Sequence, residues 1–321
     1  MAFSLAASGR KKALLAAVVC ALAVSAARAA GVPPAPETLK VRVVSWDLGF
    51  KPVSEAEWTT RVVAEVRSAS AEKIGVLVFP ELFSWGLAPY ATKGARPAEF
   101  ITARMSGSVL PAVEAAAGPD MLVALGTYPH QEAGWNHAFN RAAILLDGKW
   151  RFADKLDPTQ GESAEDPPIR PGDKLPLFSF RGGVAAIVVC FSLEKPKVSA
   201  ALKKAGVQLV LGPSATSDED GVARVLRSAS ARAVELGAAV LVAPLLGEQD
   251  GWKNMGAAAL FLPAQKGIDS TPRQSEIRAA GIHDDDFVVP WKTLLDLRLQ
   301  PEKSPETRPF LAPTPGFTLI R

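Results

Sequence analysis

The chain has 321 residues, of which 48% are hydrophobic and 21% charged, and its formal net charge is +3. Residues 1–29 hold four of the 36 basic residues and none of the 33 acidic ones, so removal of this segment leaves 292 residues with 32 basic against 33 acidic side chains. A chain this close to neutral gives no electrostatic reason to expect nucleic acid or an anionic membrane surface as a partner.

The N-terminal segment is typical of a bacterial export signal. Residues 10–12 are basic, residues 13–27 are apolar, and Ala-Arg-Ala at 27–29 offers small residues on either side of a cleavage site. The apolar stretch is shorter than the roughly 20 residues that cross a bilayer. We therefore expect cleavage after Ala29 and a periplasmic or secreted protein with no integral membrane span. Cys20 follows two valines and not a small residue, which argues against lipid attachment.

The rest of the chain predicts one large domain with short extensions. We expect a leader over residues 30–39, a domain over 40–299 and a tail over 300–321 that contains five prolines. The tail either packs along the surface or reaches across a dimer interface.

Hydrophobic periodicity predicts two strand–helix–strand units. In the first unit, residues 41–46 and 74–79 are apolar runs, and Trp58, Val62 and Val66 recur between them at helical spacing. The second unit repeats this order with a strand, a helix and a strand at residues 184–191, 198–205 and 207–211.

Further elements fill the intervals around these units. Asp147-Gly148 predicts a hairpin turn. Strands are expected at residues 121–128, 142–146, 150–152, 239–243, 257–262 and 287–290, a helix at 222–236, and a solvated turn at 283–286. Helices and strands mixed throughout indicate a single α/β domain.

Three chemically active side chains follow predicted strands. Glu81 comes just after the run 74–79, Lys155 follows the hairpin strand, and Cys190 lies at the end of the run 184–191. Open α/β sheets collect their active sites at the carboxyl ends of strands. Cys190 is the only cysteine outside the signal segment and has no intramolecular disulfide partner, so it is either a small core residue or a reactive thiol.

Other chemistries find less support. None of the three histidines, His130, His137 and His283, lies in a segment that would deliver it to Cys190 for a Cys-His protease. The three consecutive acids at 284–286 cannot all face one metal ion. The sequence therefore implies no metal and no cofactor.

Five segments, in this order, resemble the nitrilase, or carbon-nitrogen hydrolase, superfamily. Residues 77–86 are similar to its proline-glutamate motif, and residues 140–158 to the stretch from its asparagine to its lysine. Residues 184–214 are similar to the nucleophile strand of the family with its following helix and strand. Residues 231–235 are similar to the Ala-Arg-Ala helix, and residues 256–267 to the hairpin after it.

This resemblance implies an α-β-β-α sandwich, in which two sheets pack face to face with helices outside, and a homodimer that pairs through a helix layer. It implies that Cys190 is the nucleophile, that Glu81 is the general base, and that Lys155 stabilises the oxyanion together with the backbone N–H of Phe191. Glu162, with Glu165 as the second choice, would hold Lys155 in position.

The chain also departs from the family pattern. Ser192 stands where the family usually has an acid, and Lys197 follows the downstream proline where an acid is usual. Trp85, Tyr128 and Trp135 fall in segments that should border the site, where aromatic walls suit a small-molecule pocket.

Three functions remain open from the sequence. The first is an exported hydrolase that cleaves a non-peptide C–N bond in a small amide through a thioester. The second is an N-acyltransferase that passes the same intermediate to an amine, and the third is a non-catalytic binding module with this fold.

Overall fold

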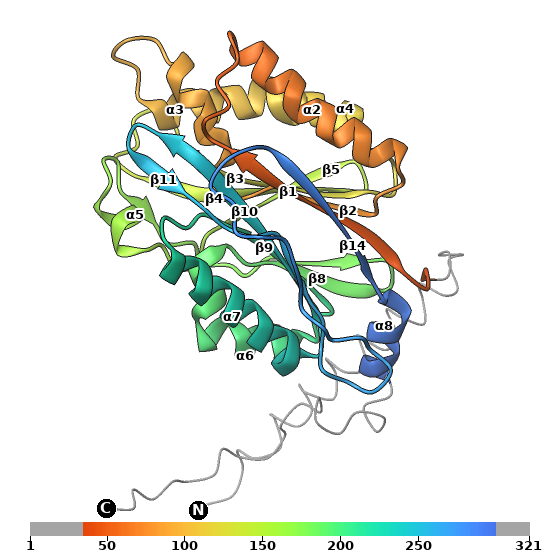
Figure 1. Cartoon of the computed structure of the whole chain (residues 1–321). Helices are drawn as coiled ribbons and strands as arrows, with labels where there is room; N and C mark the ends of the chain where they lie inside the picture. The colour runs from red at the N-terminus through yellow and green to blue at the C-terminus, as the bar shows by residue number, and fades with distance from the viewer. Residues whose placement is uncertain (1–34, 300–321) are drawn as a thin grey trace, which may run out of the picture. The chain divides into compact units, whose positions relative to one another are not determined.

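The computed structural model describes residues 35–299 (Figure 1). The chain divides into two units at Pro36 and Glu37, and every element named below belongs to the second. The predicted signal peptide, most of the leader and the tail over 300–321 lie outside the described residues and stay predictions.

The first sheet has the strand order β14-β1-β2-β3-β4-β5. Strands β1, β2 and β3 run parallel, whereas β4, β5 and β14 are antiparallel to their neighbours. A short strand, β6, pairs with β4. The bounds are β1 Leu39–Asp47, β2 Val76–Val78, β3 Leu122–His130, β4 Ala138–Leu146, β5 Lys149–Asp154, β6 Ile169–Arg170 and β14 His283–Val289.

The second sheet has the order β7-β8-β9-β10-β12-β13, with β8, β9 and β10 parallel. Strand β11 forms a hairpin with the last residues of β10. The two sheets join where β1 and β10 pair in parallel at Trp46↔Leu245 and Asp47↔Leu246. The bounds are β7 Leu177–Phe180, β8 Gly183–Ile187, β9 Leu209–Ser214, β10 Ala239–Gln249, β11 Trp252–Asn254, β12 Ala259–Phe261 and β13 Arg273–Gln274.

Helices cover the outer faces of the two sheets. Figure 1 shows α2, α3 and α4 over the first sheet and α6 and α7 over the second. This arrangement is the predicted α-β-β-α sandwich. The α-helices are α2 Glu55–Ala71, α3 Pro97–Arg104, α4 Leu110–Ala116, α5 Gln160–Ala164, α6 Pro196–Ala205, α7 Glu219–Leu236 and α8 Trp291–Leu299, with 3-10 helices at Phe83–Tyr90 and Cys190–Glu194 and a π-helical turn at Met105–Val109.

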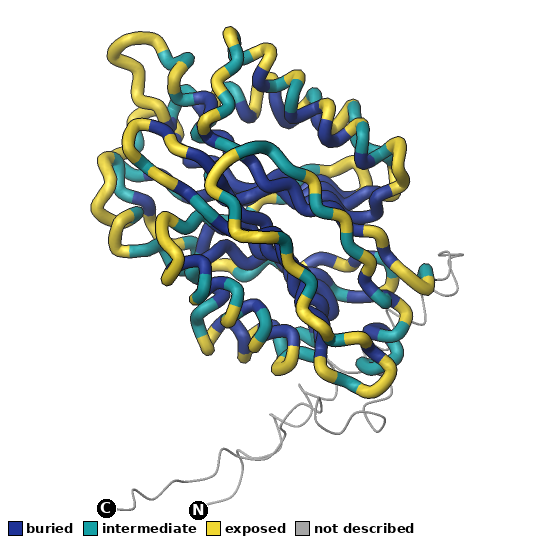
Figure 2. Tube along the Cα trace, viewed as in Figure 1, coloured by how far each residue is buried: buried dark blue, intermediate teal, exposed yellow. Residues whose placement is uncertain are grey.

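The core forms where the predicted apolar positions meet. Ser54 caps helix α2, because its side chain accepts a hydrogen bond from the Glu57 N–H, and Trp58 on the inner face of the helix is fully buried. Trp58 stacks on Phe83 and meets Trp46 edge to face, each at 5.5 Å between ring centroids. Burial follows the strands and the inner faces of the helices, as the dark tube in Figure 2 shows. Within residues 35–299, no helix is long and apolar enough to cross a bilayer.

The predicted turn at 283–286 is wrong, because these residues open strand β14 and pair with β1. Arg42 on β1 is 5% exposed, and its Nε lies 2.6 Å from Asp286 Oδ1 while its Nη1 lies 3.7 Å from Asp284 Oδ2. Asp285 pairs with Arg278 at 2.7 Å. Partners on neighbouring segments thus neutralise an acidic run that, taken alone, is typical of a solvated loop.

A second correction concerns the run 184–191, which is not strand throughout. Strand β8 ends at Ile187, where its pairing with Leu211 of β9 also ends. Cys190 then begins a 3-10 helix. The thiol therefore lies beyond the strand, in a turn.

Candidate active site

Glu81 is held in a tight turn between β2 and the 3-10 helix Phe83–Tyr90. Leu82, the next residue, has a φ of 52° and donates its N–H to Thr127 Oγ1 at 2.8 Å. On β3, Gly126 has a φ of 56°, and a Cβ added there would lie 2.0 Å from the Pro80 carbonyl oxygen. Only glycine allows this approach, so β3 packs directly against the turn and fixes the direction of the Glu81 side chain, which is 2% exposed.

Lys155 extends from the end of β5 to the same point. Its Nζ lies 2.8 Å from Glu81 Oε1 and 2.6 Å from Glu162 Oε2. Glu162 is fixed in turn by a capping box at the start of α5, in which its Oε2 accepts the Thr159 N–H at 2.7 Å. The lysine is thus buried between two carboxylates that belong to different elements.

Cys190 approaches this pair from the second sheet. Its φ is 43°, in the left-handed region that non-glycine residues rarely adopt, and such strain is concentrated at functional sites. The thiol donates to the Ala215 carbonyl oxygen at 3.6 Å, and it lies close enough to Glu81 for each group to shift the pKa of the other. The Phe191 N–H lies in the first turn of the 3-10 helix, where backbone N–H groups have no intrahelical acceptor.

The environment raises the pKa values of Glu81, Cys190 and Lys155. Burial raises the pKa of Glu81 above the usual glutamate value, although the Lys155 charge opposes the shift. Burial also raises the pKa of the Cys190 thiol, with a further contribution from the Glu81 charge. Burial would lower the pKa of Lys155, but Glu81, Cys190 and Glu162 raise it overall. The resting site therefore holds a protonated thiol and an ammonium ion.

The sequence did not assign a role to two groups that complete this network. Asn140 is fully buried, and its Nδ2 donates to Glu81 Oε1 and to Glu162 Oε1, each at 2.8 Å. The Ala215 N–H donates to Glu81 Oε2 at 2.8 Å. Asn140 opens the resembling segment 140–158, which was the one sequence signal that pointed to it; nothing marked Ala215.

The proposed pocket aromatics are spread more widely. Trp85 lies in the 3-10 helix after Glu81, and its carbonyl oxygen accepts from Gln249 Nε2 at 3.2 Å. Tyr128 belongs to the hydrophobic core cluster beneath α2, and burial raises its pKa to about 12. Trp135 lies in the β3–β4 loop and stacks on His137 at 5.1 Å. Of the three, Trp85 is the residue that the chain holds near Glu81, four positions away in sequence.

The two departures from the family pattern meet at one residue. Asp157 donates its N–H to Ser192 Oγ at 3.1 Å, and its carboxylate lies 2.6 Å from Lys197 Nζ. The segment that carries Lys155 is therefore tied to the segment that carries Cys190.

No histidine joins this group. His130 lies 3.5 Å from Glu132 and edge to face with Tyr128, and His283 contacts the Ala280 carbonyl oxygen. Among residues 35–299, no three His, Cys, Asp or Glu side chains are placed to hold a metal ion.

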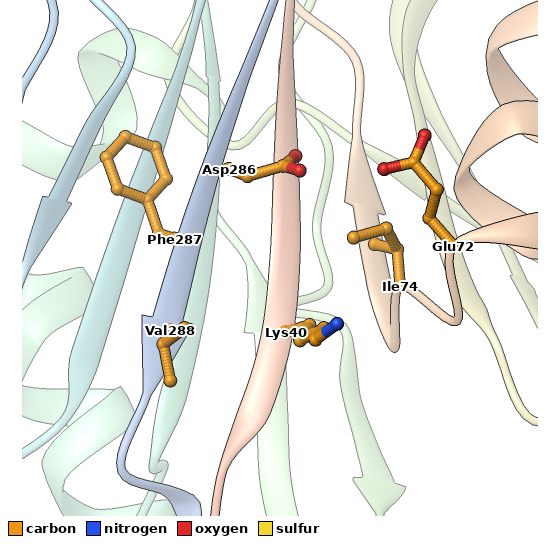
Figure 3. Close-up of a pocket in the computed structure, with 6 residues that line it drawn as sticks. All are labelled: Lys40, Glu72, Ile74, Asp286, Phe287 and Val288. Atoms are coloured by element: carbon orange, nitrogen blue, oxygen red, sulfur yellow. The ribbon is translucent and has the colours of Figure 1, made fainter.

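A cavity of about 380 Å³ lies away from these residues, along β1 and β14 (Figure 3). It is bordered by Lys40, Glu72, Ile74, Asp286, Phe287 and Val288. A far smaller space borders Lys155 and Ser192 directly.

Comparison with known proteins gives one family and one group of structures. The carbon-nitrogen hydrolase family model matches residues 40–281. The crystal structure of an amidase from Nesterenkonia sp. is 20% identical, with a TM-score of 0.60 over 85% of this chain and 97% of that chain. A cysteine-to-alanine variant of the Nesterenkonia AN1 amidase, of the nitrilase superfamily, is 21% identical, with a TM-score of 0.61 over 83% and 95%.

A glutamate-to-glutamine variant of that amidase carries the acetamide moiety of fluoroacetamide covalently added at its active-site cysteine. It is 19% identical to this chain, with a TM-score of 0.59 over 83% of this chain and 95% of that chain. At these identities the structures show the fold. The comparison with curated proteins gives no match.

Proposed function

The chain belongs to the carbon-nitrogen hydrolase family, and from that premise we propose that it hydrolyses a small non-peptide amide through a thioester on Cys190. One observation supports this proposal above the others: the Glu81 carboxylate accepts from Lys155 Nζ and from the N–H of Ala215, whose carbonyl oxygen accepts the Cys190 thiol. A base, a nucleophile and a cation brought together in one buried network are the groups that acyl transfer requires.

The first half of the reaction forms the thioester. Glu81 takes the thiol proton as the sulfur attacks the amide carbonyl carbon. The oxygen of the tetrahedral intermediate gains a negative charge, which Lys155 Nζ and the Phe191 N–H stabilise; one such donor contributes about 3 kcal/mol in comparable sites. Glu81 then passes its proton to the nitrogen as the C–N bond breaks, and ammonia or an amine leaves.

The second half of the reaction releases the acid. Glu81 takes a proton from a water molecule, whose oxygen attacks the thioester carbonyl carbon. The same donors stabilise the second oxyanion, and collapse of this intermediate returns the proton to the sulfur. Glu162 and Asn140 keep Lys155 and Glu81 in position during both steps.

The acyltransferase differs only in the acceptor of the acyl group, and the binding module lacks turnover altogether. The assay is ammonia release from a panel of small amides and nitriles by protein lacking residues 1–29, with and without hydroxylamine as an amine acceptor. We expect turnover by the wild type, none by Cys190→Ala, and full turnover by Asn136→Ala, an exposed control change. Product formed only with the amine acceptor would indicate a transferase, and absence of both products would refute catalysis.

Residues 1–29 resemble an export signal, so we also propose that the protein is exported to the periplasm or outside the cell. We further propose that it pairs into a homodimer through the layer formed by α6 and α7. Val234 is a half-exposed residue of α7, so a charge placed there would disturb such a pairing. Cell fractionation tests export. Light scattering of the wild type beside Val234→Lys tests pairing, and a monomeric wild type would refute it.

A further inference from the structure

The hairpin of β10 and β11 carries two buried side-chain amides on one face. Its register pairs Gly247 with Asn254 and Gln249 with Trp252. Residues opposite each other, and every second residue along a strand, share a face of a hairpin. Gln249 and Asn254 are 2% and 3% exposed on this inner face.

The outer face of the same hairpin differs in character. Glu248 pairs with Lys253 across the two strands, and their side chains are 53% and 73% exposed, with Lys253 Nζ 3.9 Å from Glu248 Oε2. The alternation of buried amides with exposed ions fixes which face points inward.

This inner face lies beside the residues that surround Cys190. Met255, next to Asn254, donates its N–H to the Thr216 carbonyl oxygen at 2.9 Å, and Thr216 Oγ1 donates to the Met255 carbonyl oxygen at 2.6 Å. Thr216 follows Ala215, which contacts both the Cys190 thiol and Glu81.

On the other side, Gln249 Nε2 donates to the carbonyl oxygen of Trp85, on the helix that follows Glu81. Figure 1 shows β11 at the same end of the sandwich as α5, the helix that carries Glu162. The two amides thus lie between the segment that holds Glu81 and the segment that contacts Cys190.

Three polar atoms of these amides have no partner within residues 35–299. They are Gln249 Oε1 and both Asn254 Oδ1 and Asn254 Nδ2. Buried polar groups are paired in folded proteins because an unpaired one loses its hydrogen bonds to water without replacement. A buried asparagine with both ends free is therefore a group prepared for a ligand that supplies one acceptor and one donor.

The charge of this ligand group follows from its surroundings. Within the described chain, no hydrogen bond or ion pair joins Gln249 or Asn254 to a charged side chain. A ligand carboxylate would place its oxygens, which only accept, against the side-chain oxygens of Gln249 and Asn254, and no cation pairs with either amide. A ligand ammonium would have no carboxylate paired with these amides to neutralise it. A carboxamide presents a C=O and an N–H on one edge, which matches the two ends of Asn254.

We infer that Asn254 and Gln249 form the acyl-chain subsite of this enzyme and that its substrates carry a second, uncharged carboxamide on a short chain. This inference rests on the proposed function, because it takes Cys190 as the point at which the scissile amide binds. The substrate class is then short aliphatic diamides, and Asn254 acts as a specificity-determining residue.

Binding tests the subsite without turnover. Calorimetry on the Cys190→Ala protein would compare malonamide, succinamide and glutaramide with the branched amides in which one carboxamide is replaced by an isopropyl group of equal size. We expect at least one diamide to bind tenfold or more tightly than its partner, because an isopropyl group leaves the asparagine unpaired. The same protein should bind the monocarboxylate succinamate no better than the branched amide.

Substitutions in this background locate the preference. Asn254→Leu keeps the side-chain volume and removes both free polar atoms, so it should fold as stably as its parent and should abolish or invert the preference. Gln249→Met should reduce the preference by a smaller factor, and the outward Lys253→Ala should leave it unchanged. Equal binding of every pair, or a diamide preference that survives Asn254→Leu, would overturn the inference.

Steady-state kinetics of protein with Cys190 separate the two proposals. A preference in binding without amide turnover would refute the proposed function and leave the subsite standing. Turnover with equal kcat/KM for each diamide and its branched partner would refute the subsite and leave the function standing.

Discussion

Replacement of Asn140 by leucine tests whether the buried network holds the site together. Asn140 Nδ2 donates to Glu81 and to Glu162 at 2.8 Å each, and leucine has a similar volume but no donor. A hydrogen bond to a charged group contributes about 1.5–3 kcal/mol. Each carboxylate keeps Lys155 and a backbone N–H as donors, so we expect the loss to lie at the lower end of the sum for two hydrogen bonds.

The expected loss is therefore about 3 kcal/mol of unfolding free energy. For a domain of this size, each kcal/mol lowers Tm by roughly 2–4 °C, so Asn140→Leu should unfold roughly 6–12 °C below the wild type. Loss of a donor also disfavours the charged form of Glu81, which raises its pKa further. Because the base acts when deprotonated, the acidic limb of the kcat/KM profile should move to higher pH.

Differential scanning calorimetry and a pH–rate profile measure these two effects. The matched control is Asn136→Leu, an exposed residue of the β3–β4 loop, which should change neither. An Asn140→Leu protein with an unchanged Tm and an unchanged acidic limb would show that the two hydrogen bonds of Asn140 contribute neither stability nor control of the Glu81 pKa.

Three further predictions concern the same network. In the wild type, burial raises the pKa of Glu81. In a pH–rate profile, kcat/KM should therefore fall as the pH decreases through a value above the pKa of an exposed glutamate. An acidic limb at the pKa of an exposed glutamate would contradict this. Lys155→Met removes one oxyanion donor and should lower kcat about 10²- to 10³-fold in steady-state assays, so a change below tenfold would exclude that role. The Lys197 side chain is 70% exposed in its pair with Asp157, so Lys197→Ala should lower the free energy of unfolding in urea by less than about 1 kcal/mol. Ser192 is buried, so Ser192→Asp places a second buried carboxylate beside Asp157 and should lower that free energy by more.

The fold and the order of the active groups were predictable because parallel strands have a clear sequence pattern. Buried parallel strands appear as continuous apolar runs, and residues just past their ends meet at one edge of the sheet. Glu81 was placed in this way, Lys155 was placed by the hairpin that Asp147-Gly148 predicts, and the family match confirms the resemblance that these residues carry. The local pattern was sufficient because each group is placed by its own strand.

Contacts between distant segments were not predictable from local pattern. Asn140 and Ala215 meet Glu81 across 59 and 134 positions of the chain, and no periodicity records such a pairing. The acidic strand β14 depends on Arg42, which lies about 240 positions earlier and neutralises it. Cys190 follows two valines that favour a strand, but the pairing of β8 with β9 ends before them.

The central claim is that Cys190 carries the acyl group during turnover. The most direct test is intact-mass spectrometry of the protein shortly after mixing with a substrate amide, followed by peptide mapping of the adduct. We expect a mass increase equal to the acyl group, located on the peptide that contains Cys190, removed by hydroxylamine and absent from Cys190→Ala. Turnover by the Cys190→Ala protein, or an acyl group mapped to another residue, would contradict it.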